Sequence, residues 1–211
     1  FPVYGSMIEC SECLTRLIGQ ENTMLWIGLY PERMGEAINR IGQHYLGCLK
    51  AELQAASGLL DGMVIWGDVA YRQSLLFSPD YWRRWYKPGL AAMVEACHAH
   101  DLPVIYHSCG NVAAIIEDFI EIGVDALNPL EAKADLDVVE LRERLGHRLT
   151  FCGNSDMRVW ERGDPDEIRA EVAKWTPDEV ERVSGVPEDT VRRAAKIMAD
   201  NRPGSFIWCM G

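Results

Sequence analysis

Short apolar runs that alternate with helix-like segments constrain the fold of this 211-residue chain more than any other feature. Turn residues bound the runs, which predict strands at 62–68, 102–107, 124–128 and 149–153, with a fifth candidate at 205–209. Helical periodicity predicts helices at 31–56, 78–100, 112–122, 136–145 and 164–173. Strands that are apolar on both faces and alternate with helices are typical of a parallel sheet covered by helices. We therefore predict an α/β fold of roughly four to five βα units.

Polar side chains follow four successive predicted strands. They are Asp68, His107 with Cys109, Asn128 with Glu131, and Asn154 with Asp156. In α/β barrels and open α/β sheets, chemistry takes place at the carboxyl ends of the strands. The alternative is that polar residues simply begin each loop. We favour a functional edge, because these loops use His, Cys, Glu and Asn rather than only Gly, Ser and Lys.

His107 and Cys109 lie two residues apart at the end of a predicted strand, and Gly110 permits a tight turn after them. Imidazole and thiolate are preferred zinc ligands, and a third ligand with an open position would make such a site catalytic. Two ligands alone do not make a site. On the motif alone, a hydrogen-bonded buried histidine beside an inert cysteine is the favoured interpretation.

Three further residues are candidate catalytic groups. Asp68 could orient a ligand, take a proton or bind a metal, or it could cap the next segment. Glu131 could act in the site or pair with Lys133. Asn154 could hold a substrate or brace its loop.

Charge and cysteine content exclude several classes of protein. The net charge is −11, with 21 Lys and Arg against 32 Asp and Glu, so we expect no nucleic-acid partner. No run of 18 apolar residues predicts a membrane span. Seven scattered cysteines do not resemble a secreted disulfide framework and favour the cytoplasm. The Cys10-x-x-Cys13 pair, which has no second pair at zinc-ribbon spacing, is interpreted as the start of a helix.

Residues 1–174 resemble the uroporphyrinogen decarboxylase superfamily, which contains porphyrinogen decarboxylases and cobalamin- or coenzyme M-linked methyltransferases. The resemblance is carried by Gly67-Asp68, by Phe77-Ser78-Pro79, and by the segments 106–111 (YHSCGN), 125–131 (DALNPLE) and 151–154 (FCGN). It implies a (β/α)8 TIM-type barrel with its active site at the carboxyl ends of the strands. We therefore expect this chain to form part of such a barrel.

The H-x-C pair at His107 and Cys109 resembles the methyltransferase branch, in which zinc held by H-x-C and a later cysteine activates a thiol. The resemblance thus implies bound zinc and a small-molecule substrate: a thiol and a methyl donor, such as a corrinoid protein. The alternative is a decarboxylase of tetrapyrrole biosynthesis, a lyase that needs no cofactor. In the decarboxylases, arginines that hold the substrate carboxylates and an aspartate lie near the N-terminal part of the barrel. We expect that part to precede residue 1, so these residues cannot be assigned in this sequence.

Residues 175–211 resemble a different family, the molybdopterin-dependent formate dehydrogenase catalytic subunit. The motifs are Trp175-Thr176-Pro177, Gly185-Val186-Pro187 and Asn201-Arg202-Pro203-Gly204. We therefore predict a barrel fragment at 1–174 and a mostly helical segment at 175–211 that ends in a strand, with both chain ends cut from something longer. A third hypothesis follows, an inactive fusion of two fragments or a piece of a molybdopterin oxidoreductase. Four or five βα units cannot close an eight-stranded barrel, so strand edges would need pairing, as in a homo-oligomer.

Overall fold

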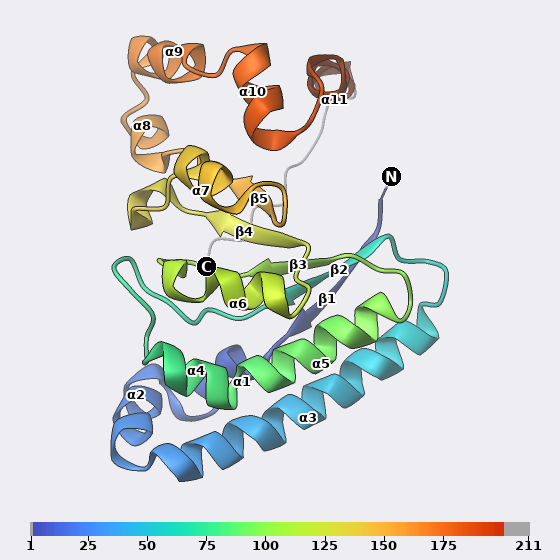
Figure 1. The fold of residues 1–211 in the computed structure, drawn as a ribbon, viewed down its shortest axis with the longest axis vertical. Helices are drawn as coiled ribbons and strands as arrows, with labels where there is room; N and C mark the ends of the chain where they lie inside the picture. Colours follow the sequence, from blue (N-terminus) through green and yellow to red (C-terminus); the bar gives the residue numbers. More distant parts are fainter. Residues whose placement is uncertain (1, 201–211) are drawn as a thin grey trace.

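The computed structural model describes residues 2–200, which form a five-stranded sheet flanked by helices (Figure 1). The strands are β1 (Tyr4–Ile8), β2 (Gly62–Trp66), β3 (Val104–His107), β4 (Ala126–Leu130) and β5 (Thr150–Gly153). The α-helices are α1 (Cys10–Ile18), α2 (Gln20–Leu29), α3 (Pro31–Ala55), α4 (Pro79–Trp85), α5 (Lys87–His98), α6 (Ile116–Glu121), α7 (Val138–Leu145), α8 (Met157–Arg162), α9 (Pro165–Ala173), α10 (Pro177–Ser184) and α11 (Glu188–Asp200). Two short 3₁₀ turns, η1 (Ala113–Ile115) and η2 (Ala132–Ala134), follow β3 and β4.

All five strands are parallel and pair in chain order, β1-β2-β3-β4-β5. Each connection carries helices, as parallel neighbours require. The register aligns Ile8, Trp66, His107 and Asn128 in one row near the carboxyl ends. This order confirms the predicted partial α/β barrel and brings the polar strand ends to one edge of the sheet.

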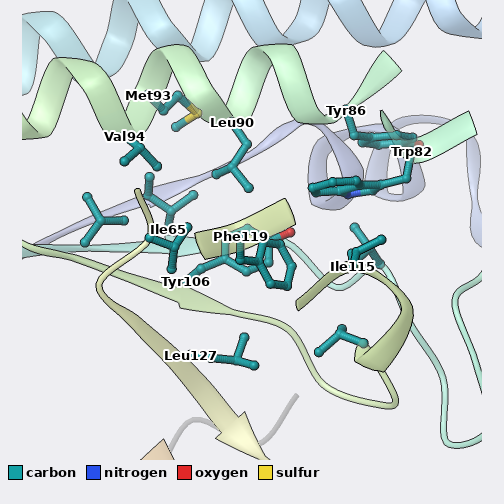
Figure 2. Close-up of a cluster of buried hydrophobic side chains, with 14 of the residues drawn as sticks. Ile65, Trp82, Tyr86, Leu90, Met93, Val94, Tyr106, Ile115, Phe119 and Leu127 are labelled. Atoms are coloured by element: carbon teal, nitrogen blue, oxygen red, sulfur yellow. The ribbon is translucent and has the colours of Figure 1, made fainter. Parts of the chain in front are cut away.

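The core lies between the central strands and the helices α4, α5 and α6 (Figure 2). Side chains alternate between the two faces of a strand. Ile65 and Tyr106 point toward the helices and are fully buried, whereas Trp66 lies on the opposite face and is only half-buried. Phe119 of α6 packs against both Trp82 and Tyr106, with ring centroids 5.5 and 4.8 Å apart. The helix-facing layer therefore anchors β2 and β3, whose ends carry the candidate site.

The predicted helix at 78–100 is two helices in the structure, because Pro88 has no N–H to donate within a continuous helix. Ser78 caps α4 as expected, accepting a hydrogen bond from the backbone N–H of Tyr81. The strand β1 was not predicted. The predicted strand at 205–209 lies outside the described residues.

The segment after β5 is helical, and one buried side chain ties it to the preceding unit. The Arg142 guanidinium on α7 donates hydrogen bonds to the carbonyl oxygens of Val183 (2.6 Å), Gly146 (2.5 Å) and Leu149 (3.3 Å). Because Val183 belongs to α10, this cluster joins α10 to α7 across the predicted boundary at residue 174. The position of that boundary stays a prediction.

Among residues 2–200, none of the helices has the length and apolar character needed to cross a membrane.

Candidate metal centre

Asp68, His107 and Cys109 come together at the carboxyl edge of β2 and β3. One ligand atom from each lies within 4.8 Å of the other two. The His107 Nε2 atom is 3.7 Å from Cys109 Sγ and 3.8 Å from Asp68 Oδ1. Zinc bonds of about 2.0–2.3 Å place neighbouring ligand atoms roughly 3.3–3.8 Å apart in a tetrahedral site. In the described part of the chain, this is the only such trio of His, Cys, Asp or Glu side chains.

Asn128 orients the imidazole of His107. The His107 Nδ1–H group donates to Asn128 Oδ1 at 2.8 Å, so the lone pair lies on Nε2 and faces Cys109. The Trp66 indole packs beside the imidazole, with ring centroids 4.4 Å apart, and His107 is only 7% exposed. A second nitrogen held by an oxygen acceptor is the usual support of a metal-binding histidine. The ring is therefore held with Nε2 facing the other two donor atoms, an orientation in which it could bind a metal ion.

The thiol of Cys109 lies in an acidic and partly buried environment. Burial, and then the negative charges of Asp68 and Glu131, raise the pKa of Cys109 to about 12, and only Lys133 opposes them. The Glu12 carboxylate adds to the same effect. Negative charge concentrated around a sulfur, a nitrogen and an oxygen donor favours a divalent cation over an anion.

Glu131 and Asn154 lie at the same edge of the sheet but have different partners. Glu131 Oε2 accepts the Gly110 N–H at 2.6 Å, and its Oε1 lies 3.0 Å from Lys133 Nζ. Asn154 accepts the Val138 N–H and donates to the carbonyl of Leu136. Glu131 thus contacts the turn that follows Cys109, whereas Asn154 braces the loop before α7. The catalytic roles predicted for them stay predictions.

Glu9 is a buried acidic residue beside the end of β2 that was not predicted from the sequence. It follows β1, is 3% exposed, and accepts hydrogen bonds from the Ser11 hydroxyl and from the Cys10 thiol at 3.0 Å. Burial raises the pKa of Glu9, which favours its neutral form. The only signal was a strand followed by a polar side chain, as at the other four strand ends, and the glycine and serine within β1 weaken it. Cys10 is the first residue of α1, as expected for the C-x-x-C pair.

Comparisons with known proteins agree with this architecture. The family model for Uroporphyrinogen decarboxylase (URO-D) matches residues 1–185. Among solved structures, the chain is similar to a methyltransferase from Methanosarcina mazei, with a TM-score of 0.65 and 20% sequence identity. The match covers 94% of this chain and 58% of the methyltransferase chain. A comparison with curated proteins finds no match.

Proposed function

The chain belongs to the uroporphyrinogen decarboxylase family, and from this premise we propose that it works as a zinc-dependent methyltransferase, activating a thiol and transferring a methyl group to it. The observation that carries the proposal is the convergence of Asp68 Oδ1, His107 Nε2 and Cys109 Sγ. Imidazole, thiolate and carboxylate are all zinc ligands, and three protein ligands leave a fourth position for a substrate. The predicted later cysteine ligand is then not needed, because Asp68 supplies the third donor atom.

Each residue of the trio has a role that follows from its contacts. His107 presents Nε2 because Asn128 holds the Nδ1 proton. Cys109 is placed by its own backbone N–H, which donates to Asp68 Oδ1 at 2.8 Å. When bound, zinc would act as a Lewis acid that lowers the pKa of a substrate thiol, so that the sulfur can accept a methyl group. We propose that Glu131 fixes the turn after Cys109 and that Asn154 braces the loop before α7.

A cofactor-free decarboxylase of tetrapyrrole biosynthesis is the second candidate, since the family model carries that description. Its substrate would carry several carboxylates. The residues around Cys109 offer three carboxylates, from Asp68, Glu131 and Glu12, against the single ammonium of Lys133. Like charges repel, so this edge is poorly suited to a polyanion. The charge balance therefore supports the methyltransferase proposal.

The chain spans 58% of the Methanosarcina mazei methyltransferase, so the activity of a complete barrel is itself part of the proposal. A homo-oligomer that pairs the strand edges, a cytoplasmic location and a fused segment at 175–211 belong to the same set of proposals. Sedimentation of the purified chain tests the first of these. An inactive chain would transfer no methyl group even when supplied with zinc.

Zinc content measured by elemental analysis tests the proposal directly. We expect one zinc ion per folded chain, and loss of that ion in Cys109→Ser. The matched control is Cys48→Ser, because the Cys48 thiol also lies 3.7 Å from an imidazole nitrogen, that of His44, but is exposed and outside the trio. A folded wild-type protein without zinc, or equal loss in both variants, would contradict the proposal.

A methyl-transfer assay then separates the two candidate functions. With a methyl donor and a thiol acceptor, activity should need zinc and disappear in Cys109→Ser. Decarboxylation of a porphyrinogen that persists after chelation would favour the second candidate instead.

A further inference from the structure

We propose that Tyr106 and Ser108 are positioning residues, whose hydroxyl groups set the place of Asp68 relative to His107 and Cys109. The inference deepens the proposed function, because it concerns the same trio. It rests on how two short segments, 67–69 after β2 and 106–109 at the end of β3, are joined.

Every residue from 106 to 109 makes one hydrogen bond to the segment 67–69. Tyr106 Oη donates to the Gly67 carbonyl (2.8 Å), the Gly67 N–H donates to the His107 carbonyl (2.9 Å), the Val69 N–H donates to Ser108 Oγ (3.2 Å), and the Cys109 N–H donates to Asp68 Oδ1 (2.8 Å). Asp68 therefore lies between two anchored neighbours, and its carboxylate is held by the segment 106–109, which carries His107 and Cys109.

Only two of the four bonds depend on side chains of β3 and its loop. The bonds of His107 and Cys109 use backbone atoms, which any residue there would supply. Tyr106 and Ser108 supply hydroxyl oxygens, and both residues, like Val69, are fully buried. Because water does not reach these groups, losing either hydroxyl leaves a buried backbone group without its partner. The identity of these two residues thus decides how firmly the turn at Asp68 is held.

The other side of this turn is closed as well. A Cβ atom placed on Gly67 would overlap the carboxyl group of Glu9 and the hydroxyl of Tyr106. Glu9 also donates its backbone N–H to the Trp66 carbonyl at 2.8 Å, which ties β1 to the end of β2. Glu9 and Tyr106 thus leave no room for a side chain at residue 67, and they restrict the backbone conformation just before Asp68. The Tyr106 hydroxyl therefore acts twice: it donates a hydrogen bond to the Gly67 carbonyl, and it fills part of the space beside Gly67.

The test compares Tyr106→Phe and Ser108→Ala with Tyr81→Phe. The Tyr81 hydroxyl donates to the Pro31 carbonyl at 3.1 Å, so the control removes the same kind of bond at a different place. The first readout is the affinity for Zn²⁺, measured by competition with a chromophoric chelator, together with the visible spectrum of the Co²⁺ form. Substitution of a residue that supports a metal ligand typically weakens metal affinity ten- to a hundredfold. We expect about tenfold weaker binding and an altered Co²⁺ spectrum in the first two variants, and no change in Tyr81→Phe.

The second readout needs no metal. Hydrogen exchange of the Cys109 amide, followed by NMR, reports its bond to Asp68 Oδ1. Beyond any change in global stability, exchange should become about tenfold faster in Tyr106→Phe and Ser108→Ala but not in Tyr81→Phe.

The two readouts also separate the two proposals. If the wild-type chain binds no metal, the proposed function fails, and exchange of the Cys109 amide still decides the positioning role. Exchange and affinity within twofold of wild type in both variants would overturn the positioning role alone. If Tyr106→Phe does not fold, Ser108→Ala decides the question, because it removes a single buried oxygen.

Discussion

Replacing Gly110 by alanine would test how tightly the turn after Cys109 is constrained. Gly110 has φ = +85°, a conformation that L-residues rarely adopt. A Cβ atom there would lie 2.7 Å from the Tyr71 carbonyl oxygen and 2.8 Å from the Ala70 carbonyl carbon, both backbone atoms. The Gly110 N–H meanwhile donates to Glu131 Oε2 at 2.6 Å. The new methyl group can therefore be accommodated only if this turn or the 70–71 loop moves.

The cost has three parts. A non-glycine residue at positive φ costs about 1 kcal/mol. Moving the Tyr71 carbonyl adds to this, because it accepts the Asn111 N–H at 2.9 Å, and a lost hydrogen bond in a partly buried loop costs about 1 kcal/mol. Residual overlap with the backbone brings the expected total to about 3 kcal/mol. Gly163 is the matched control, with φ = +66° and nothing within 4 Å of a Cβ atom placed on it, so Gly163→Ala should cost only about 1 kcal/mol.

Urea unfolding of the two variants measures these free energies, provided that both keep the wild-type m-value. Zinc affinity gives an independent reading, since movement of residue 110 shifts Cys109 but movement of residue 163 does not. If Gly110→Ala is no more destabilising than Gly163→Ala, the crowding argument is wrong. If it is more destabilising but binds zinc as tightly as wild type, the turn is rigid without serving the metal centre.

Two further predictions concern the supports of the fold and of the imidazole. Asp118→Asn should lower the free energy of unfolding by about 2 kcal/mol at pH 7, because it removes the negative charge and one of the two oxygens that accept hydrogen bonds from Arg83 and Lys87 at 2.8–3.2 Å. Burial alone would raise the Asp118 pKa, but the hydrogen bonds from Arg83 and Lys87 outweigh it and lower that pKa. The difference in the free energy of unfolding between variant and wild type, measured in urea, should therefore shrink as the pH falls below about 4. A difference that stays constant with pH would refute this. Asn128→Leu should weaken zinc binding about ten- to a hundredfold in chelator competition, because it removes the acceptor of the His107 Nδ1 proton, whereas Asn128→Asp keeps an acceptor and should bind at least as tightly as wild type.

The sheet could be predicted from the sequence because buried parallel strands are apolar on both faces and turn residues bound them. That pattern located β2 to β5 and showed that their polar ends would share one edge. It missed β1, where a glycine and a serine dilute the apolar signal and the strand lies at the edge of the sheet. The start of α4 could be predicted from local chemistry, because Ser78 is a good N-cap residue. The break at Tyr86 was missed, because the strong helical periodicity of 78–100 hides the effect of Pro88, which has no N–H to donate.

The candidate site was predictable only in part. The spacing of His107 and Cys109 indicated a shared centre, because His107 ends the strand β3 and Cys109 follows two residues later in the adjoining loop. Whether Asp68 would reach them depends on the register between β2 and β3, which a single sequence does not encode in any local pattern. Asn128 and Asn154 look alike in sequence, yet one holds the imidazole and the other braces a loop. That difference is set by the direction of each side chain in three dimensions.

The trio joins residues that are far apart in the chain, since Asp68 and Cys109 are separated by 41 positions. An ion bound there would link these positions only in the folded chain, because the unfolded chain has no preformed site, and its binding free energy would add to the stability of the fold. Unlike a disulfide, this link would form and break with the concentration of free metal, and the stabilisation would grow with the logarithm of that concentration. The pairing of β2 with β3 would then depend on metal supply as well as on the core behind it.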